Sequence, residues 1–82
     1  MIRAKVYVTL KKGVLDPQGE TVRGALETLG FAGVQDVRVG KFMVVTLNEV
    51  SREEASRRVD QMCKKLLANP VIEDYRFELE EG

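Results

Sequence analysis

Cys63 carries a thiol, and this side chain could act as a nucleophile. It lies on the apolar stripe of a predicted helix, and the sequence contains one Cys and no His. A thiol needs a nearby base or positive charge to become a reactive thiolate, and His most often supplies it. A free Cys on an apolar stripe usually behaves as a small hydrophobic residue. We therefore expect Cys63 to be buried and structural, and we identify no catalytic residue.

Acidic residues occur in groups that could, in principle, bind a metal. These groups are Glu53-Glu54, Glu73-Asp74 and a C-terminal run at positions 78, 80 and 81. A metal site needs several oxygen ligands that converge on one point. These spacings give no converging set on a single element, so the sequence predicts solvated acidic surfaces without a metal or cofactor.

Arg38 and Lys41 flank a predicted turn and could hold an anion or an acidic partner. Exposed charges are common, so a solvated turn is the simpler interpretation. The Gly-Phe-Ala-Gly segment at residues 30–33 is not a phosphate loop, because it follows a helix and lacks a Gly-Lys-Ser/Thr ending. Tyr7 and Tyr75 could stack on bases, but the aromatic-rich strands of RNA-binding plaits are absent.

The overall composition favours a small intracellular domain. The 82 residues contain 13 basic and 13 acidic side chains, and this balance argues against a general nucleic-acid binder. No apolar run is long enough to span a membrane, and a single Cys fits a reducing cytoplasm. A chain of this size buries a marginal core, so surplus apolar faces would indicate oligomerisation.

The first half of the chain begins with a strand and a helix. Residues 2–10 alternate strictly between apolar and polar types, which predicts a strand with one buried face. Asp16 can cap a helix that has Pro17 at its first position, and Gly30 is a good left-handed stop. Gly19 and Gly24 weaken this helix, and we expect the close approach of a neighbouring backbone to explain both.

The segment from Val34 to Leu47 is rich in β-forming residues and is interrupted by Gly40. Gly40 either opens a two-residue type II′ hairpin or marks a bulge at which one long strand bends. After it, Phe42 and Val44 make a second strand face apolar. Because a monomeric single-layer sheet would leave that face in water, we expect Phe42 and Val44 to mediate self-association.

A second helix and a final strand complete the chain. Ser51 and Glu54 form a capping box, and Pro70 stops the helix near residue 68. The predicted apolar stripe of this helix comprises Ala55, Val59, Met62, Cys63, Leu66 and Leu67. Residues 74–80 then alternate again, as expected for a strand.

This order predicts a single α+β domain over residues 1–82. The favoured architecture is a ferredoxin-like βαββαβ plait with two helices on one sheet face. The alternative is a three-stranded variant in which one long strand bends at Gly40. In the plait the first and last strands are antiparallel neighbours, which would bring Arg3 and Lys5 near Glu78 and Glu80.

Four segments together resemble the PurS family, the small subunit of phosphoribosylformylglycinamidine synthase. They span residues 6–11, 14–19, 36–41 and 62–75. Each motif is weak alone, but their order and spacing in a chain of this length are specific, and the similarity runs nearly end to end.

The resemblance implies a complex with a large ATP-using synthetase subunit, PurL, and a glutaminase subunit, PurQ. The glutaminase releases ammonia, and the synthetase activates the substrate amide with ATP and Mg and inserts the ammonia. The small subunit has no catalytic residues and binds no cofactor. It self-associates as a dimer or tetramer and bridges the two enzymes.

Combined with this resemblance, the motifs at turns predict the partner contacts. The predicted interface residues are Asp16, Pro17, Gln18, Gly19, Arg38, Gly40, Lys41, Asn69, Pro70 and Tyr75. One rival hypothesis is a regulatory plait that binds a small effector between subunits. Another is an acylphosphatase-like enzyme, for which Arg38 and Asn48 are poor candidates.

Overall fold

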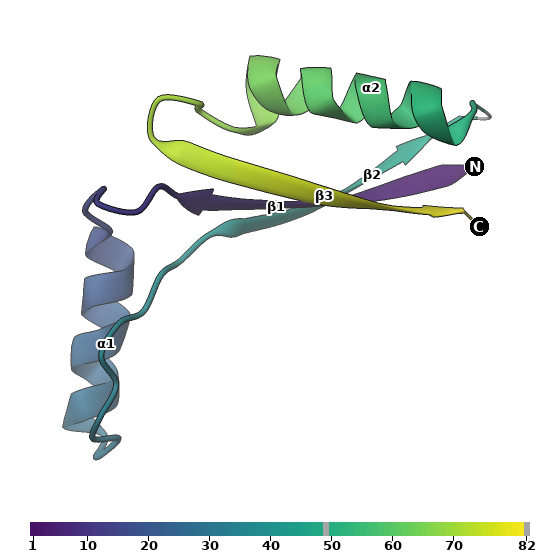
Figure 1. The fold of residues 1–82 in the computed structure, drawn as a ribbon. Helices are drawn as coiled ribbons and strands as arrows, with labels where there is room; N and C mark the ends of the chain where they lie inside the picture. Colours follow the sequence, from purple (N-terminus) through teal and green to yellow (C-terminus); the bar gives the residue numbers. More distant parts are fainter. Residues whose placement is uncertain (49, 82) are drawn as a thin grey trace.

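A computed structural model describes residues 1–48 and 50–81 as an antiparallel sheet with two helices (Figure 1). The sheet order is β2-β1-β3, with β1 in the centre. The elements in chain order are β1 (Ile2–Leu10), α1 (Pro17–Thr28), β2 (Lys41–Leu47), α2 (Arg52–Met62), the π-helical turn η1 (Cys63–Leu67) and β3 (Glu73–Glu81). The α+β fold is therefore confirmed in its three-stranded, ferredoxin-like form.

The core lies between α2 and the inner face of the sheet. Alternate residues of β1 point toward α2, which gives Ile2, Ala4, Val6 and Val8 their burial. From α2 and η1, Ala55, Val59 and Cys63 pack against them. Burying each Val-sized side chain contributes about 1.5–3 kcal/mol. The predicted structural burial of Cys63 is confirmed.

The predicted apolar stripe of the second helix is wrong at Leu66, which is 82% exposed. The helix widens after Met62, and the amide of Ala68 donates to the carbonyl of Cys63, five residues back, at 3.0 Å. The wider turn shifts the phase of the helix. Ala68 is consequently buried, while Leu66 turns to solvent.

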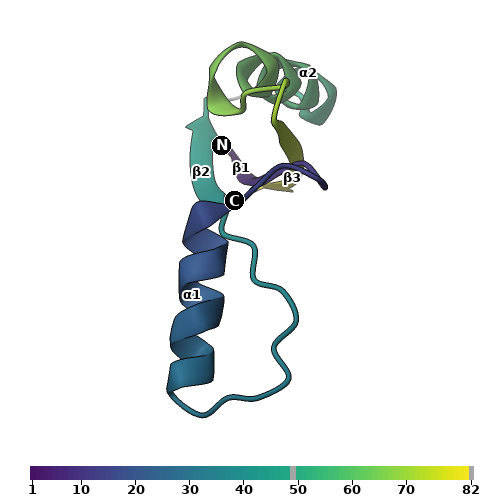
Figure 2. The ribbon, with the colours of Figure 1, turned by 90° about the vertical axis from the view of Figure 1, so that its left-hand side faces the viewer.

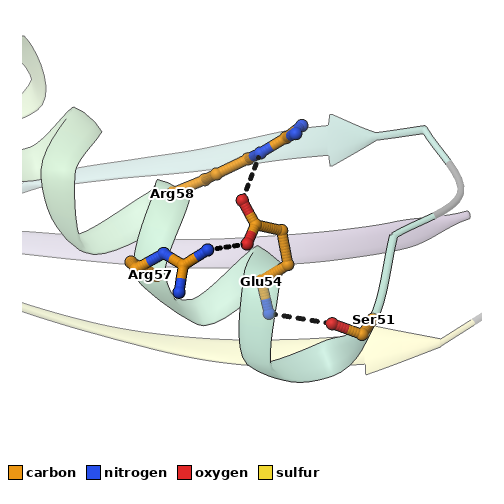
Figure 3. Close-up of polar contacts among 4 residues, drawn as sticks. All are labelled: Ser51, Glu54, Arg57 and Arg58. Atoms are coloured by element: carbon orange, nitrogen blue, oxygen red, sulfur yellow. Dashed lines mark hydrogen bonds and ion pairs between the residues drawn. The ribbon is translucent and has the colours of Figure 1, made fainter.

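The start of α2 follows the predicted capping box in part (Figure 3). The Ser51 Oγ accepts from the backbone N–H of Glu54 at 3.1 Å, as an N-cap should. The Glu54 carboxylate binds the guanidinium groups of Arg57 and Arg58. Ser51 is thus confirmed as the cap, and Glu54 stabilises the first turn through i,i+3 and i,i+4 ion pairs.

The pairing of the terminal strands confirms the predicted charge complementarity. In the register of β1 and β3, Arg3 lies opposite Glu80 and Lys5 lies opposite Glu78. The Lys5 Nζ forms a diagonal ion pair with a Glu80 carboxylate oxygen at 3.1 Å. Opposite charges on neighbouring strands favour this pairing by about 0.2–1 kcal/mol.

Gly40 forms neither the predicted hairpin nor a bend in one long strand. Residues 34–40 have no regular structure, and β2 begins at Lys41, which pairs with Val8. A type II′ turn needs a positive φ, and Gly40 has none. Glycine is required here because a Cβ at Gly40 would collide with the Val8 carbonyl.

The segment before β2 instead runs beside α1, as Figure 2 shows. A Cβ at Gly19 would collide with the carbonyl of Val37, so only glycine permits this close approach. The expectation that a neighbouring backbone explains Gly19 is confirmed. The same expectation is wrong at Gly24, where a Cβ would meet no atom within 4 Å.

The predicted placement of both helices on one sheet face holds for α2 alone. α1 lies beyond one end of the sheet, on the side away from α2, and makes no extensive contact with the sheet (Figures 1 and 2). In a four-stranded plait, residues 34–39 would form the strand beneath α1. Because that strand is absent, α1 has no sheet surface of its own chain to cover.

Two alanine substitutions test this account of the helix glycines. We expect Gly19→Ala to lower the free energy of unfolding by about 1–3 kcal/mol, because the new methyl group displaces the Val37 carbonyl. Gly24→Ala, within the same helix and in open space, should raise it by about 0.5–1 kcal/mol. Urea unfolding measures both. Equal effects of the two variants would contradict the close approach at Gly19.

Candidate partner-binding site

Asp16 anchors the start of α1 to the segment that precedes β2. Its Oδ1 accepts from the Gly19 N–H at 2.9 Å, and its Oδ2 accepts from the Val39 N–H at 2.8 Å. The residue is only 5% exposed. Hydrogen bonds from Gly19 and Val39, with the nearby charge of Arg38, lower the pKa of the Asp16 carboxyl. The predicted cap is confirmed, and it also joins two distant segments.

Arg38 fastens the turn that follows β1. Its guanidinium donates to the carbonyl of Lys11 at 3.1 Å and to that of Val14 at 3.0 Å. Hydrogen bonds from a charged donor are stronger than neutral ones, so these contacts hold the turn against the segment of residues 34–40. We expected Arg38 and Lys41 to be able to hold an anion or an acidic partner. The guanidinium of Arg38 forms hydrogen bonds within the chain.

A shallow pocket brings together residues that are far apart in the sequence. It has a volume of about 330 Å³ and is lined in part by five predicted interface residues, Asp16, Pro17, Gln18, Gly40 and Lys41. Gly19 lies next to them as the residue that donates to Asp16. This grouping supports the idea that these turn motifs form one surface.

Glu73 connects that pocket to the turn between η1 and β3. Its Oε1 accepts from the Asn69 N–H at 2.6 Å, and its Oε2 lies 3.5 Å from the Lys41 Nζ. The Asn69 Oδ1 accepts from the Val71 N–H at 3.1 Å, which fixes the turn at Pro70. We refer to Asp16, Pro17, Gln18, Gly40, Lys41, Asn69, Pro70 and Glu73 as the turn cluster.

Sequence reasoning assigned Glu73 to a solvated acidic surface and so missed its connecting role. The available signal was local, because Glu73 lies four residues after Asn69 and directly after the turn. The partner on β2, Lys41, is distant in sequence, and only the fold brings it near.

Tyr75 has a different environment from the turn cluster. Its side chain packs against the core, and its hydroxyl donates to the Asp60 Oδ1 at 2.6 Å. This bond to Asp60, together with burial, raises the pKa of Tyr75 to about 12. The second Asp60 oxygen lies 2.9 Å from the Lys64 Nζ. The hydroxyl of Tyr75 therefore holds β3 to α2.

The outer face of the sheet, which we define as the face away from α2, carries an exposed apolar patch. Phe42 is 56% exposed and Val44 is 53% exposed, whereas Met43 and Val45 point inward and are half-buried. The ring of Tyr7 lies 5.1 Å from that of Phe42, and the Arg76 guanidinium lies over Tyr7 at 3.9 Å. This patch is the surface that the sequence predicts for self-association.

The described residues present shape and charge without an activated group. Burial and the charge of Asp60 raise the pKa of the Cys63 thiol, which keeps it protonated. Among residues 1–48 and 50–81, no three Cys, Asp or Glu side chains gather where they could hold a metal. In the same residues, every buried side-chain polar atom has a hydrogen-bond partner.

A protein-family model described as "PurS: Phosphoribosylformylglycinamidine (FGAM) synthase" matches residues 3–81. The chain belongs to the PurS family. The predicted resemblance is therefore confirmed. The chain is a PurS-type subunit of phosphoribosylformylglycinamidine synthase, an enzyme of purine biosynthesis. The match covers both the turn cluster and the outer face.

Individual PurS relatives agree with this assignment over nearly their full length. The PurS subunit of Bacillus subtilis is 54% identical over 81 residues, which are 99% of this chain and 95% of that protein. The PurS subunit of Methanocaldococcus jannaschii is 44% identical, again over 99% of this chain, and 98% of that protein is covered.

Solved structures show the same fold in the family. A crystal structure of Bacillus subtilis PurS superposes with a TM-score of 0.88 at 53% identity and covers 99% of this chain and 100% of that chain. A chain in the structure of PurLQS from Thermotoga maritima superposes with a TM-score of 0.85 at 28% identity, with 98% of this chain and 99% of that chain covered.

One further observation concerns the helices of this PurS-family chain. In the part of the chain that the structure describes, no helix has both the length and the apolar character needed to cross a bilayer.

The lowered pKa of Asp16 predicts a defined acid dependence of stability. A carboxyl whose pKa is depressed on folding stabilises the fold above its ordinary value of 3.8, and that contribution is lost as the pH falls below 3.8 toward the lower folded value. We expect Asp16→Asn to lower the melting temperature at pH 7, since an amide offers one acceptor oxygen where two are used.

Melting temperatures from pH 7 to pH 2 measure this effect. The difference between the natural chain and Asp16→Asn should shrink below pH 3.8. Asp36→Asn, an exposed position in the segment beside α1, serves as the control and should leave the pH 7 value unchanged. A constant difference across the whole range would contradict the role of the Asp16 carboxylate.

Proposed function

We propose that this chain is a non-catalytic subunit that bridges a PurL-type synthetase and a PurQ-type glutaminase and supports the transfer of ammonia between them. The observation that carries this proposal is the superposition, over nearly the whole chain, on a chain of the PurLQS structure. The described residues add two suitable surfaces, the turn cluster and the outer face.

In this role the glutamine-dependent ligase reaction takes place on the partner subunits. The glutaminase releases ammonia from glutamine, and the synthetase uses ATP and Mg to activate the amide of formylglycinamide ribonucleotide, which ammonia then attacks. This chain binds neither ATP nor Mg itself. Its contribution is to hold the two enzymes so that ammonia reaches the second site before it escapes into water and becomes protonated.

The turn cluster suits this task because its backbone is fixed before any partner binds. Asp16 and Glu73 each hold groups from two separate segments, and Arg38 holds two carbonyls of the turn that follows β1. A preorganised surface loses little conformational entropy on binding, which improves affinity. Arg38 and Gly19 contribute by setting the shape, while Gln18, Lys41, Asn69 and Pro70 are exposed to a partner.

Self-association through Phe42 and Val44 is the second part of the proposal. Both side chains are more than half exposed on the outer face. A dimer or tetramer would remove them from water and present more than one copy of the turn cluster. The lone buried Cys63 fits a cytoplasmic location.

The pocket at the turn cluster favours an alternative, in which this chain is a regulatory plait that binds a small effector. The pocket has a volume of about 330 Å³ and contains both the Lys41 ammonium and the largely buried carboxylate of Glu73. Thermal stabilisation of the isolated chain by a small metabolite would support this alternative.

The bridging role predicts a dependence on the nitrogen donor. With purified synthetase and glutaminase subunits, we expect omission of this chain to abolish amidation of formylglycinamide ribonucleotide when glutamine is the donor. With ammonium chloride as the donor, omission should reduce the rate much less, because no transfer between subunits is needed. Equal loss with both donors would place this chain in the synthetase reaction, and no loss with either would contradict the proposal.

Charge changes at the turn cluster test the partner surface. Gln18→Arg combined with Lys41→Glu should weaken assembly with the two partners by about tenfold or more, since both side chains are exposed beside the pocket. Size-exclusion chromatography of the mixed subunits measures assembly. Lys65→Glu, an exposed change on η1, is the matched control. Undiminished assembly of the double variant would remove the turn cluster from the interface.

A further inference from the structure

A second pocket lies between the turn that follows β1 and the segment that precedes β2. Its volume of about 510 Å³ is within the usual range of small-molecule sites. None of the residues that line it belongs to the turn cluster, so it is a separate feature of the surface. The lining residues are Thr9, Leu10, Lys12, Gly13, Asp36 and Arg38.

Contacts within the chain fix the two walls of this pocket. The Val14 N–H donates to the Lys11 carbonyl at 3.0 Å and closes a β-turn, in which Gly13 has a φ of 91° that favours glycine. The Nη2 of Arg38 then joins the carbonyls of Lys11 and Val14 to the segment of residues 34–40. Both walls are therefore in place before a ligand binds, which lowers the entropic cost of binding.

The charged groups that line the pocket are still available to a ligand. A guanidinium has five N–H groups, and both internal bonds of Arg38 use Nη2, which carries two of them. Within residues 1–48 and 50–81, neither Lys12 nor Asp36 takes part in an ion pair, although both line the same pocket. The pocket thus presents two positive charges and one negative charge that do not pair with one another.

This set of charges discriminates among classes of small molecule. Inorganic phosphate or a simple dicarboxylate would be attracted by Lys12 and Arg38 but repelled by Asp36. An α-amino acid with an acidic side chain carries two carboxylates and one ammonium group, which complement the three charges of the pocket in sign and number. The methylene groups of such a ligand suit contact with Leu10, the apolar member of the lining.

We propose that this pocket binds a dicarboxylic α-amino acid, with glutamate as the ligand. Asp36 accepts from the ammonium group, Arg38 donates to the α-carboxylate, and Lys12 pairs with the side-chain carboxylate. The choice of glutamate rests on the proposed function, because hydrolysis of the glutamine amide by the glutaminase gives glutamate together with ammonia. The bridging subunit would then bind a product of the reaction that it supports.

Titration of the isotope-labelled natural chain, followed by nuclear magnetic resonance, tests this binding. At constant ionic strength, we expect L-glutamate to shift the amide signals around Lys12 and Asp36 with a Kd of about 1–10 mM, since exposed ion pairs are individually weak. Glutarate lacks the ammonium group and glutamine lacks the second carboxylate. Each should therefore bind about three- to fivefold more weakly than glutamate.

Two substitutions should change the ligand preference in different ways. Asp36→Asn should weaken the binding of glutamate and strengthen that of glutarate, because the carboxylate attracts the ammonium group of the first and repels the second. Lys12→Gln should weaken the binding of glutamate and leave that of glutamine unchanged, because the glutamine side chain has no charge to pair with Lys12. Lys65→Gln, at an exposed position on η1, is the matched control and should alter none of the three affinities.

Other outcomes overturn the proposal in distinguishable ways. No shift at glutamate concentrations up to about ten times the expected Kd removes the site. Equal affinities for the three ligands, or equal losses of all three in each variant, would contradict the recognition of individual charges. Shifts centred on Lys41 and Glu73 would place the ligand in the turn-cluster pocket and overturn this site. The amidation assay with glutamine and ammonium tests the bridging role separately, so either proposal can fail alone.

Discussion

The direction of α1 depends on the carboxylate of Asp16. α1 makes no extensive contact with the sheet, so few forces other than its base contacts orient it. Each oxygen of Asp16 accepts one backbone N–H, from Gly19 inside the helix and from Val39 just before β2. A carboxylate can satisfy two donors that approach from different directions, whereas a Ser or Thr cap is shorter and has one oxygen. The same bonds that cap the helix therefore set its angle to the sheet, and with it the shape of the chain.

That shape explains why the sheet has two unlike faces. The inner face of β1 is covered by α2 and is fully apolar, while the outer face combines paired charges with Phe42 and Val44. One helix is enough to cover one face of three strands, and large apolar side chains such as Leu29, Phe42 and Val44 stay exposed outside that core. Association is then a way to complete the burial that a single chain leaves unfinished. This view connects the exposed helix, the exposed patch and the extended shape through one physical cause.

The sequence predicts the elements best where the signal is local. The alternation of residues 2–10 and the caps at Asp16 and Ser51 follow from neighbouring residues. Residues 34–39 were wrongly predicted to be a strand because β-propensity depends on an available partner strand. For the site, turn motifs identified most of the turn cluster, but Glu73 and the internal role of Arg38 rest on contacts between distant segments. By sequence, Tyr75 was grouped with the turn motif of residues 62–75. In the structure, its hydroxyl donates to Asp60 and holds β3 to α2.

In the described residues, the buried polar side chains are engaged in hydrogen bonds. These bonds leave no activated group, and they also fix the surface that could bind a partner. Catalytic side chains require a perturbed group left available to a substrate, and here the buried polar atoms all have partners. The Asp16 carboxylate and the Arg38 guanidinium bind backbone groups of neighbouring segments, and these bonds restrict the conformations of those segments. A surface fixed in this way pays little entropy when it binds, and its exposed polar residues can give specificity. Under the bridging function proposed above, such rigidity would contribute more than a reactive side chain.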